Sequence, residues 1–114
     1  MQLFGIPNCS TVKKARDWLT NSGVAYEFYD FKKQGVSHEL LAGWLSQVPW
    51  EKLVNRSGMT WRNLTDVEKS AVIDANSALN LMIDKSSVIK RPVLVSDGKI
   101  VCLGFTEAAY KELL

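Results

Sequence analysis

The chain has 114 residues, of which 46% are hydrophobic and 23% charged, and its net charge is +2. These values exclude a largely disordered protein and predict a single domain, residues 1–114, with a buried core. The small charge gives no reason to expect nucleic acid or a membrane surface as a partner. No apolar run approaches the ~18 residues of a membrane span, and the N-terminus lacks the features of a signal peptide, so we expect the reducing cytoplasm.

The N-terminal third predicts a β-α-β unit. Residues 2–5 (QLFG) form a short apolar strand, and a loop with Pro7 follows. A helix then begins near Ser10 and Thr11, both good N-cap types, because small and apolar residues recur at helical spacing up to about residue 20. Residues 24–31 (VAYEFYDF) alternate and are rich in aromatic residues, which is typical of a strand. The two strands should be parallel, with a right-handed crossover.

The middle of the chain, about residues 37–86, predicts a helical block. Ser37 precedes a clean helical pattern that Pro49 ends. Thr65 with Glu68 forms a capping box that should open a further helix. The remaining segments are a polar turn at 32–36, a helical turn at 50–54, a loop at 55–63, and helices at 66–75 and 77–86.

The C-terminal third predicts a β-β-α unit. A strand at 93–95 and a strand at 100–103 flank the sequence Ser-Asp-Gly-Lys, whose Asp-Gly pair favours a tight hairpin turn. Thr106 can cap a final helix at 107–114. The element order β-α-β, helical block, β-β-α predicts an α/β protein of the thioredoxin-like fold. It would have a four-stranded mixed sheet, helices on both faces, and a helical insertion between the two halves.

Cys9 is the strongest candidate for a chemical role. It lies between the first strand and the first helix, where free backbone N–H groups and the helix dipole favour a thiolate. Lys13, one turn further on, adds positive charge. The alternative is that Cys9 has no chemical role and is simply a small buried residue at the end of a strand. Position 12 is Val, so no Cys-x-x-Cys pair exists, and any disulfide chemistry at Cys9 needs a second thiol from elsewhere.

The other candidates for a functional role have weaker support than Cys9. Cys102 could supply the second thiol, but it lies in a predicted strand, where core filling is the commoner role. Arg56, Arg62 and Arg91 could bind an oxyanion bidentately, although most arginines are solvated. The single histidine, His38, fits an exposed helix start, and one histidine with two distant cysteines gives no metal-ligand pattern.

Five segments together resemble the arsenate reductase (ArsC) family, which includes the YffB-like proteins and the Spx-type transcription regulators. Individually they are short, but they occur in the family's order along almost the whole chain, and they are most similar to the YffB-like branch. The segments are Gly-Ile-Pro-Asn-Cys9-Ser-Thr-Val-Lys-Lys-Ala, Leu53-Val-Asn-Arg56-Ser-Gly, Thr60-Trp-Arg62-Asn-Leu, Ile89-Lys-Arg91-Pro92-Val-Leu and Gly104-Phe105.

The resemblance implies a redox nucleophile at Cys9 and a cis peptide bond before Pro92. Arg56 and Arg91 match two of the three arginines that surround the cysteine in glutaredoxin-dependent arsenate reductases. The third arginine is absent, because its stretch is Cys102-Leu103-Gly104-Phe105 here. The missing second cysteine also separates this chain from the two-cysteine Spx regulators.

These observations predict a glutathione-dependent thiol oxidoreductase with no bound cofactor or metal. Glutathione, or a glutaredoxin- or thioredoxin-type protein, would resolve the adduct on Cys9. Arsenate reduction proper and a non-enzymatic, Spx-like protein-binding regulator stay open as alternatives. The residues expected to stabilise the thiolate or an oxyanion are Ser10, Thr11, Lys13, Arg56 and Arg91. Those expected to contact the substrate or thiol partner are Asn8, Arg91 and Pro92.

Overall fold

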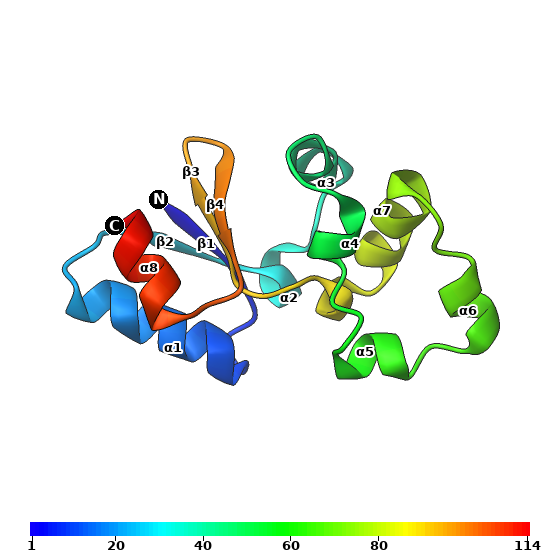
Figure 1. Ribbon diagram of the computed structural model, residues 1–114, viewed down its shortest axis with the longest axis horizontal. Helices are drawn as coiled ribbons and strands as arrows, with labels where there is room; N and C mark the ends of the chain where they lie inside the picture. Colours follow the sequence, from blue (N-terminus) through cyan, green and yellow to red (C-terminus); the bar gives the residue numbers. More distant parts are fainter. The chain divides into compact units, whose positions relative to one another are not determined.

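The computed structural model describes all 114 residues and divides into two compact units. The first unit joins both ends of the chain, Met1–Gln34 and Arg91–Leu114, and the second is Gly35–Lys90. The second unit contains helices and no strand of the sheet, so it corresponds to the helical insertion expected at about 37–86 (Figure 1). No helix is long and apolar enough to cross a bilayer.

The first unit is built on a four-stranded mixed sheet. Its strands are β1 (Gln2–Gly5), β2 (Glu27–Asp30), β3 (Val93–Ser96) and β4 (Lys99–Leu103). They lie in the order β2-β1-β3-β4, with β1 parallel to β2 and β3 antiparallel to both of its neighbours. This is the thioredoxin-like arrangement that the element order predicts, and the parallel β1–β2 pair confirms the β-α-β unit.

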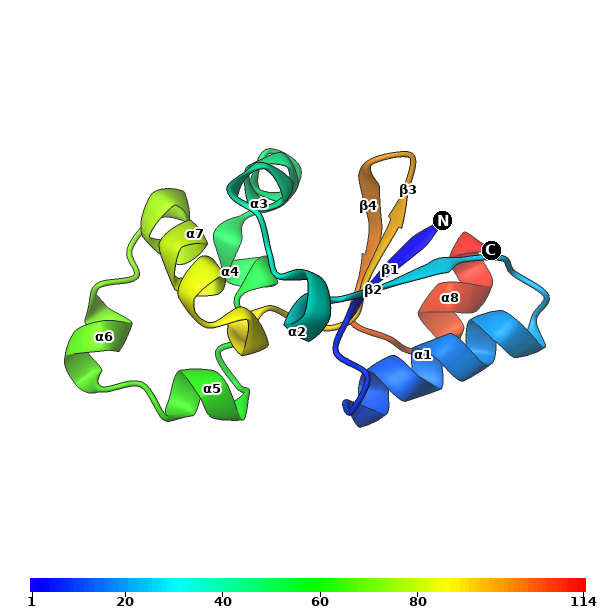
Figure 2. The same ribbon diagram turned by 180° about the vertical axis from the view of Figure 1, so that it is seen from behind.

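Helices α1 (Ser10–Asn21) and α8 (Glu107–Leu113) cover one face of this sheet and lie side by side in both ribbon views (Figures 1 and 2). The rings of Trp18 and Tyr110 meet edge to face at 5.6 Å, which fixes the two helices against each other. Five fully buried residues form the core between the sheet and these helices: Leu3, Ala15, Leu19, Leu94 and Tyr110.

The opposite face of the sheet carries Phe4, because neighbouring residues of a strand point to opposite sides. Phe31, the first residue of the short helix α2 (Phe31–Gln34), packs on Phe4 with 6.3 Å between ring centroids. The side chain of Phe31 is almost completely buried. Helical residues therefore pack on both faces of the sheet within the first unit, as predicted.

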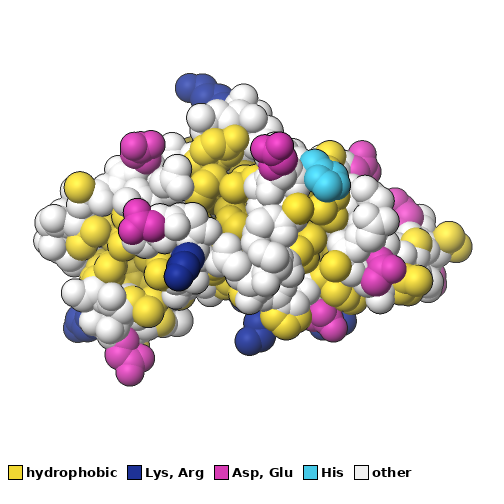
Figure 3. Space-filling model, turned by 90° about the horizontal axis from the view of Figure 1, so that it is seen from above, with side chains coloured by type: hydrophobic (Ala, Val, Ile, Leu, Met, Phe, Trp, Pro, Cys, Tyr) yellow, Lys and Arg dark blue, Asp and Glu magenta, His cyan; other side chains and the backbone are white.

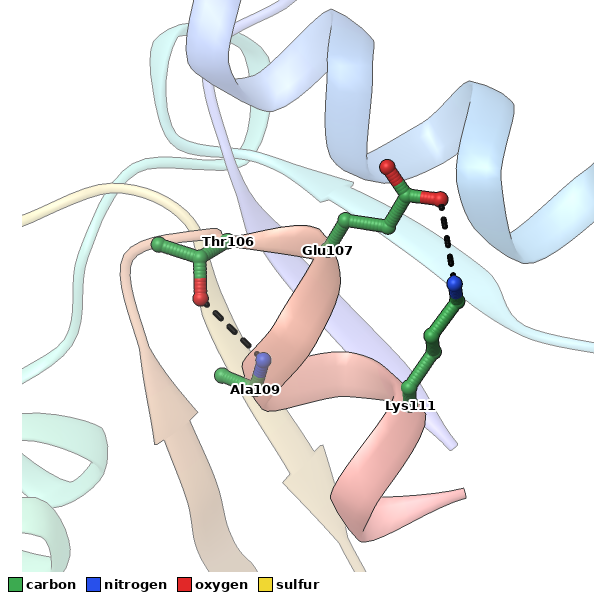
Figure 4. Close-up of polar contacts among 4 residues, drawn as sticks. All are labelled: Thr106, Glu107, Ala109 and Lys111. Atoms are coloured by element: carbon green, nitrogen blue, oxygen red, sulfur yellow. Dashed lines mark hydrogen bonds and ion pairs between the residues drawn. The ribbon is translucent and has the colours of Figure 1, made fainter.

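Two local predictions in the C-terminal third are confirmed. Asp97 and Gly98 both have positive φ, 51° and 77°, as the two-residue hairpin turn requires. The Thr106 hydroxyl accepts a hydrogen bond from the Ala109 N–H at 3.1 Å and caps α8 (Figure 4). Glu107 and Lys111 add an exposed ion pair at 3.7 Å on the same helix.

The second unit consists of five short α-helices and one 3-10 turn. Ser37 caps the first of them, and Thr65 with Glu68 forms the predicted capping box in front of α6. Apolar side chains from several of these helices are buried, among them Leu41, Trp44 and Met82. The elements are α3 (His38–Leu45), α4 (Trp50–Leu53), α5 (Met59–Arg62), α6 (Asp66–Ser70), α7 (Ala75–Asp84) and η1 (Ser86–Val88).

Four predicted segments differ from the structure. The strand expected at 24–31 is only Glu27–Asp30, because its partner β1 offers four residues for pairing. The turn expected at 32–36 is a helical turn, α2, and the loop expected at 55–63 contains α5. The helix expected at 66–75 ends at Ser70, because the Asp74 carboxylate accepts the Ser77 N–H at 2.8 Å and starts α7 instead.

Candidate active site

Cys9 occupies the N-cap position of α1. Its backbone is extended, with φ −102° and ψ 126°, and its carbonyl accepts the first hydrogen bond of the helix, from the Lys13 N–H at 2.9 Å. The prediction that Ser10 or Thr11 caps this helix is wrong, because both residues already have helical backbone positions. A cysteine without a strong capping hydrogen bond therefore stands where Ser, Thr or Asp is usual.

Gly5 and Val12 set the position of this helix start. A Cβ on Gly5 would lie 2.8 Å from Cγ2 of Val12, so only glycine lets the end of β1 pass this close to the first turn of α1. Val12 itself is fully buried and anchors the turn. Sequence reasoning missed this pair, although a glycine four residues before the cysteine was the available signal.

The pKa of Cys9 is lowered by its surroundings. Partial burial alone would raise the pKa, but hydrogen bonds from the Val12 N–H, the Arg91 side chain and the Thr11 N–H to the sulfur outweigh it. The positive charge of Arg91 acts in the same direction. These donors stabilise the thiolate rather than the thiol, which is the form that attacks other sulfur atoms. The Cys9 side chain makes no capping hydrogen bond in the structure. Donors close to the sulfur act mainly on the thiolate, because a hydrogen bond to a charged acceptor is stronger than one to a neutral thiol.

Arg91 reaches Cys9 from the strand side of the first unit. It precedes β3, its side chain is half-buried, and the Arg91–Pro92 peptide bond is cis, as the resemblance implied. Pro92 is buried, and its carbonyl accepts the Gly104 N–H at 2.8 Å. Leu103, the register partner of Val93, lies in the stretch 102–105, which contains no arginine.

The other expected site residues are distributed as follows. Asn8, Ser10 and Lys13 are exposed beside Cys9 on the loop and first turn of α1. Arg56 belongs to the second unit, where its exposed guanidinium lies 5.5 Å from the centre of the Trp50 ring. The structure thus brings Arg91 and the amides of α1 to Cys9 within one unit.

Cys102 has a different environment from Cys9. It is half-buried in β4, and burial raises the pKa of its thiol. Its side chain packs against the core of Leu3, Leu94 and Tyr110, and its thiol lies 3.7 Å from the Gly104 carbonyl oxygen, to which it donates. These contacts favour a neutral core thiol.

No group of three or more His, Cys, Asp and Glu side chains is arranged to hold a metal ion. His38 is the first residue of α3 and is exposed, and the space-filling view also shows a histidine at the surface (Figure 3). The position of His38 agrees with its interpretation as an exposed helix start.

Comparisons with known proteins add to this geometry. The model of the ArsC family matches residues 4–113. A solved structure named YffB is 42% identical, with a TM-score of 0.91, over 99% of this chain and 97% of its own. An arsenate reductase (ArsC) related protein from Brucella melitensis is 47% identical, with a TM-score of 0.80, over 97% and 91%. A global transcriptional regulator Spx from Streptococcus agalactiae is 27% identical over 98% of this chain and 81% of its own.

The matched residues include the Cys9 loop, Arg91 and Pro92, and they extend over nearly the whole chain. Two solved relatives share more than 40% of their residues with it and also share its fold. The chain belongs to the ArsC family.

Proposed function

We propose that this protein is a thiol oxidoreductase in which Cys9 is the nucleophile and glutathione is the resolving thiol. The observation that carries the proposal is the set of donors around the Cys9 sulfur. Two helix amides and the Arg91 guanidinium together lower its pKa. Reactive cysteines need such a thiolate-favouring, partly exposed site, and Cys9 is half-exposed.

The reaction has three balanced exchange steps. The Cys9 thiolate attacks one sulfur of a disulfide, the S–S bond breaks, and the leaving thiolate takes the electron pair and a proton from water. A glutathione thiolate then attacks the mixed disulfide, restores the Cys9 thiolate and leaves as part of a new disulfide. At this point one half of the substrate is a free thiol and the other half is in a mixed disulfide with glutathione. A second glutathione thiolate attacks that mixed disulfide, releases the second substrate thiol and forms oxidised glutathione. A glutaredoxin- or thioredoxin-type thiol could perform the second step in place of glutathione.

The surrounding residues have complementary roles in this proposal. Arg91 and the first-turn amides hold the thiolate before attack, and Arg91 can hold a carboxylate of the incoming thiol afterwards. Asn8, which is exposed on the loop before Cys9, contacts the partner, and Pro92, which is buried, positions Arg91 just before β3. Cys102 takes no part, because its raised pKa keeps it a thiol.

Mass spectrometry after incubation with oxidised glutathione tests the proposal. We expect one glutathione per chain, attached at Cys9, and loss of the adduct when reduced glutathione is added. Cys102→Ser should behave as the wild type, and Cys9→Ser should give no adduct. Attachment at Cys102 alone, or no adduct at neutral pH, would contradict the proposal.

Arsenate reduction is a second candidate, favoured by the Arg91 cation beside Cys9 and by the names of solved relatives. Arsenic(V) would become arsenic(III) as two thiols are oxidised to one disulfide and one oxygen leaves as water. The absence of an arginine at residues 102–105 counts against it. Arsenite production with glutathione and glutaredoxin decides the matter: a rate equal to that of Cys9→Ser would remove this candidate.

A regulator that binds a protein partner is the candidate from another class, because the Spx relatives are named as transcriptional regulators. A stoichiometric partner recovered equally well by wild type and Cys9→Ser would favour it. If the protein is instead the proposed oxidoreductase, we expect any recovered partner to be held through Cys9 and therefore to be lost in Cys9→Ser.

A further inference from the structure

A cavity of about 300 Å³ lies along α1, next to the Cys9 loop. It begins at Pro7, two residues before Cys9, and continues along one stripe of the helix at i, i+3, i+4 and i+7. Tyr26, just before β2, closes the far side. The lining residues all belong to the first unit: Pro7, Lys13, Arg16, Asp17, Thr20 and Tyr26.

Arg16 is held in place within this cavity. Its Nε donates a hydrogen bond to the Tyr26 hydroxyl at 3.2 Å, and its guanidinium carbon lies 4.0 Å from the centre of the Phe28 ring. These contacts use Nε and one face of the guanidinium, and they leave the two terminal nitrogens as the donors for a bidentate ligand. A side chain oriented in advance loses less entropy when it binds.

The cavity also has an excess of positive charge. Lys13 and Arg16 line it, and neither forms an ion pair with a carboxylate in the structure. Asp17 is the one acidic group in the lining. Carboxylates are the natural ligands of an oriented arginine beside a lysine.

We propose that this cavity binds a carboxylate of the peptide thiol that reacts at Cys9. This inference rests on the proposed function and assigns a substrate class: an anionic thiol of tripeptide size, of which glutathione is the probe. Along a helix rising 1.5 Å per residue, Lys13 is about 6 Å and Arg16 about 10 Å beyond Cys9. The thiol of glutathione is on the middle residue of a chain about 10 Å long, so about half of that length separates the sulfur from a terminal carboxylate. The long side chains of Lys13 and Arg16 supply the rest of the reach from the helix.

The test compares an anionic with a neutral disulfide. The rate at which oxidised glutathione modifies Cys9 is divided by the rate for hydroxyethyl disulfide, and this ratio isolates the contribution of the carboxylates. We expect Lys13→Gln and Arg16→Gln each to lower the ratio about threefold, the scale of one solvent-exposed ion pair. The decrease should shrink in 1 M salt, where charges are screened within about 3 Å.

Two matched variants on the same helix sharpen the test. Lys14→Gln removes a charge that does not line the cavity and should leave the ratio unchanged. Asp17→Asn removes the opposing carboxylate and should raise the ratio, a gain that damage to the fold would not produce. An unchanged ratio in Lys13→Gln, Arg16→Gln and Asp17→Asn, with a normal rate for the neutral disulfide, would overturn the cavity proposal and leave the proposed function intact.

A binding measurement tests the cavity without relying on the reactivity of Cys9. S-methylglutathione has no reactive sulfur, so its effect on the NMR signals of the protein is independent of Cys9 chemistry. Shifts at Arg16, Thr20 and Tyr26 that disappear in Arg16→Gln would support the cavity even if Cys9 reacted with neither disulfide. The absence of shifts at these residues would overturn it.

Discussion

Cys9 and Cys102 show how position decides the chemistry of the same side chain. Both thiols are half-buried, and desolvation alone raises the pKa of each. Cys9 also meets two helix amides and a guanidinium, which reverse the direction of its shift. Cys102 meets only the carbonyl oxygens of Leu103 and Gly104 and core side chains, which give a thiolate no stabilisation.

Arg91→Gln should slow the reaction of Cys9 with the neutral reagent iodoacetamide by about tenfold at pH 7, because one charge-assisted hydrogen bond to the thiolate is lost. The thiol then keeps its proton to higher pH. Stopped aliquots analysed by mass spectrometry give the rate. Arg62→Gln removes an exposed arginine from the second unit and should react like the wild type. Equal rates for Arg91→Gln and Arg62→Gln would show that Arg91 does not hold the thiolate.

Tyr110→Phe should raise the free energy of unfolding by about 1 kcal/mol, because a buried hydroxyl without a partner costs that much or more. The Tyr110 side chain is fully buried, and its hydroxyl oxygen has no hydrogen-bond partner. Urea unfolding measures the change. The ring contacts with Trp18 and Phe105 stay in place in this variant. A loss of stability would mean that the hydroxyl makes a favourable contact after all.

At the scale of elements, the approach of β1 to α1 holds the nucleophile in position. Strand β1 is packed in the middle of the sheet, and Val12 locks the first turn of α1 against its end. The amide of Val12 also lowers the pKa of Cys9. Packing at Gly5 and the pKa of Cys9 are therefore linked through one residue.

Gly5→Ala should destabilise the protein by about 1–3 kcal/mol, because the new methyl group overlaps the Val12 side chain. Val12→Ala should relieve the overlap, so the double variant should lose less stability than the sum of the two single variants. Urea unfolding of the four proteins gives the coupling. Strict additivity would mean that the two residues do not touch.

The elements differ in how well the sequence specifies them. Helix α8 and the Asp97–Gly98 turn are predicted well, because each depends on contacts within four residues. The length of β2 is predicted poorly, because its partner strand sets it. The start of α1 is off by one residue, since Cys9 takes a cap position that its side chain scarcely favours.

For the whole molecule, the half-buried thiol of Cys102 and the buried hydroxyl of Tyr110 determine how the free energy of unfolding changes at alkaline pH. Burial raises the pKa of Cys102 and of Tyr110 above their ordinary values of 9.0 and 10.0. The unfolded chain loses these protons first as pH rises, so their contribution to stability is full below pH 9 and decreases above it. Cys9 has the opposite sign, because its lowered pKa gives stability that grows as pH rises towards 9.

Urea unfolding between pH 6 and pH 11 should therefore show a wild type that gains stability relative to Cys9→Ser up to about pH 9. Above pH 10 the wild type should lose stability faster than Tyr110→Phe. Both differences compare variants at one pH, so the other titrating groups cancel. A difference between wild type and Cys9→Ser that does not depend on pH would contradict the lowered pKa of Cys9.

The candidate site is predicted only in part by the sequence. Cys9 is identified from its own neighbourhood, but Arg91 is 82 positions away, and its place beside Cys9 depends on β3 pairing with β1. The resemblance supplied that connection. No sequence pattern predicted the cavity lined by Arg16 and Tyr26. It forms only when the folded chain brings α1 next to the residues just before β2.

Titration of the Cys9 thiol measures directly whether its thiolate is stabilised. Ultraviolet absorbance of the thiolate, followed against pH in Cys102→Ser, reports Cys9 alone once the signal of a Cys9→Ser and Cys102→Ser double variant is subtracted. We expect a midpoint below the ordinary thiol value of 9.0. A midpoint at or above 9.0 would contradict this stabilisation.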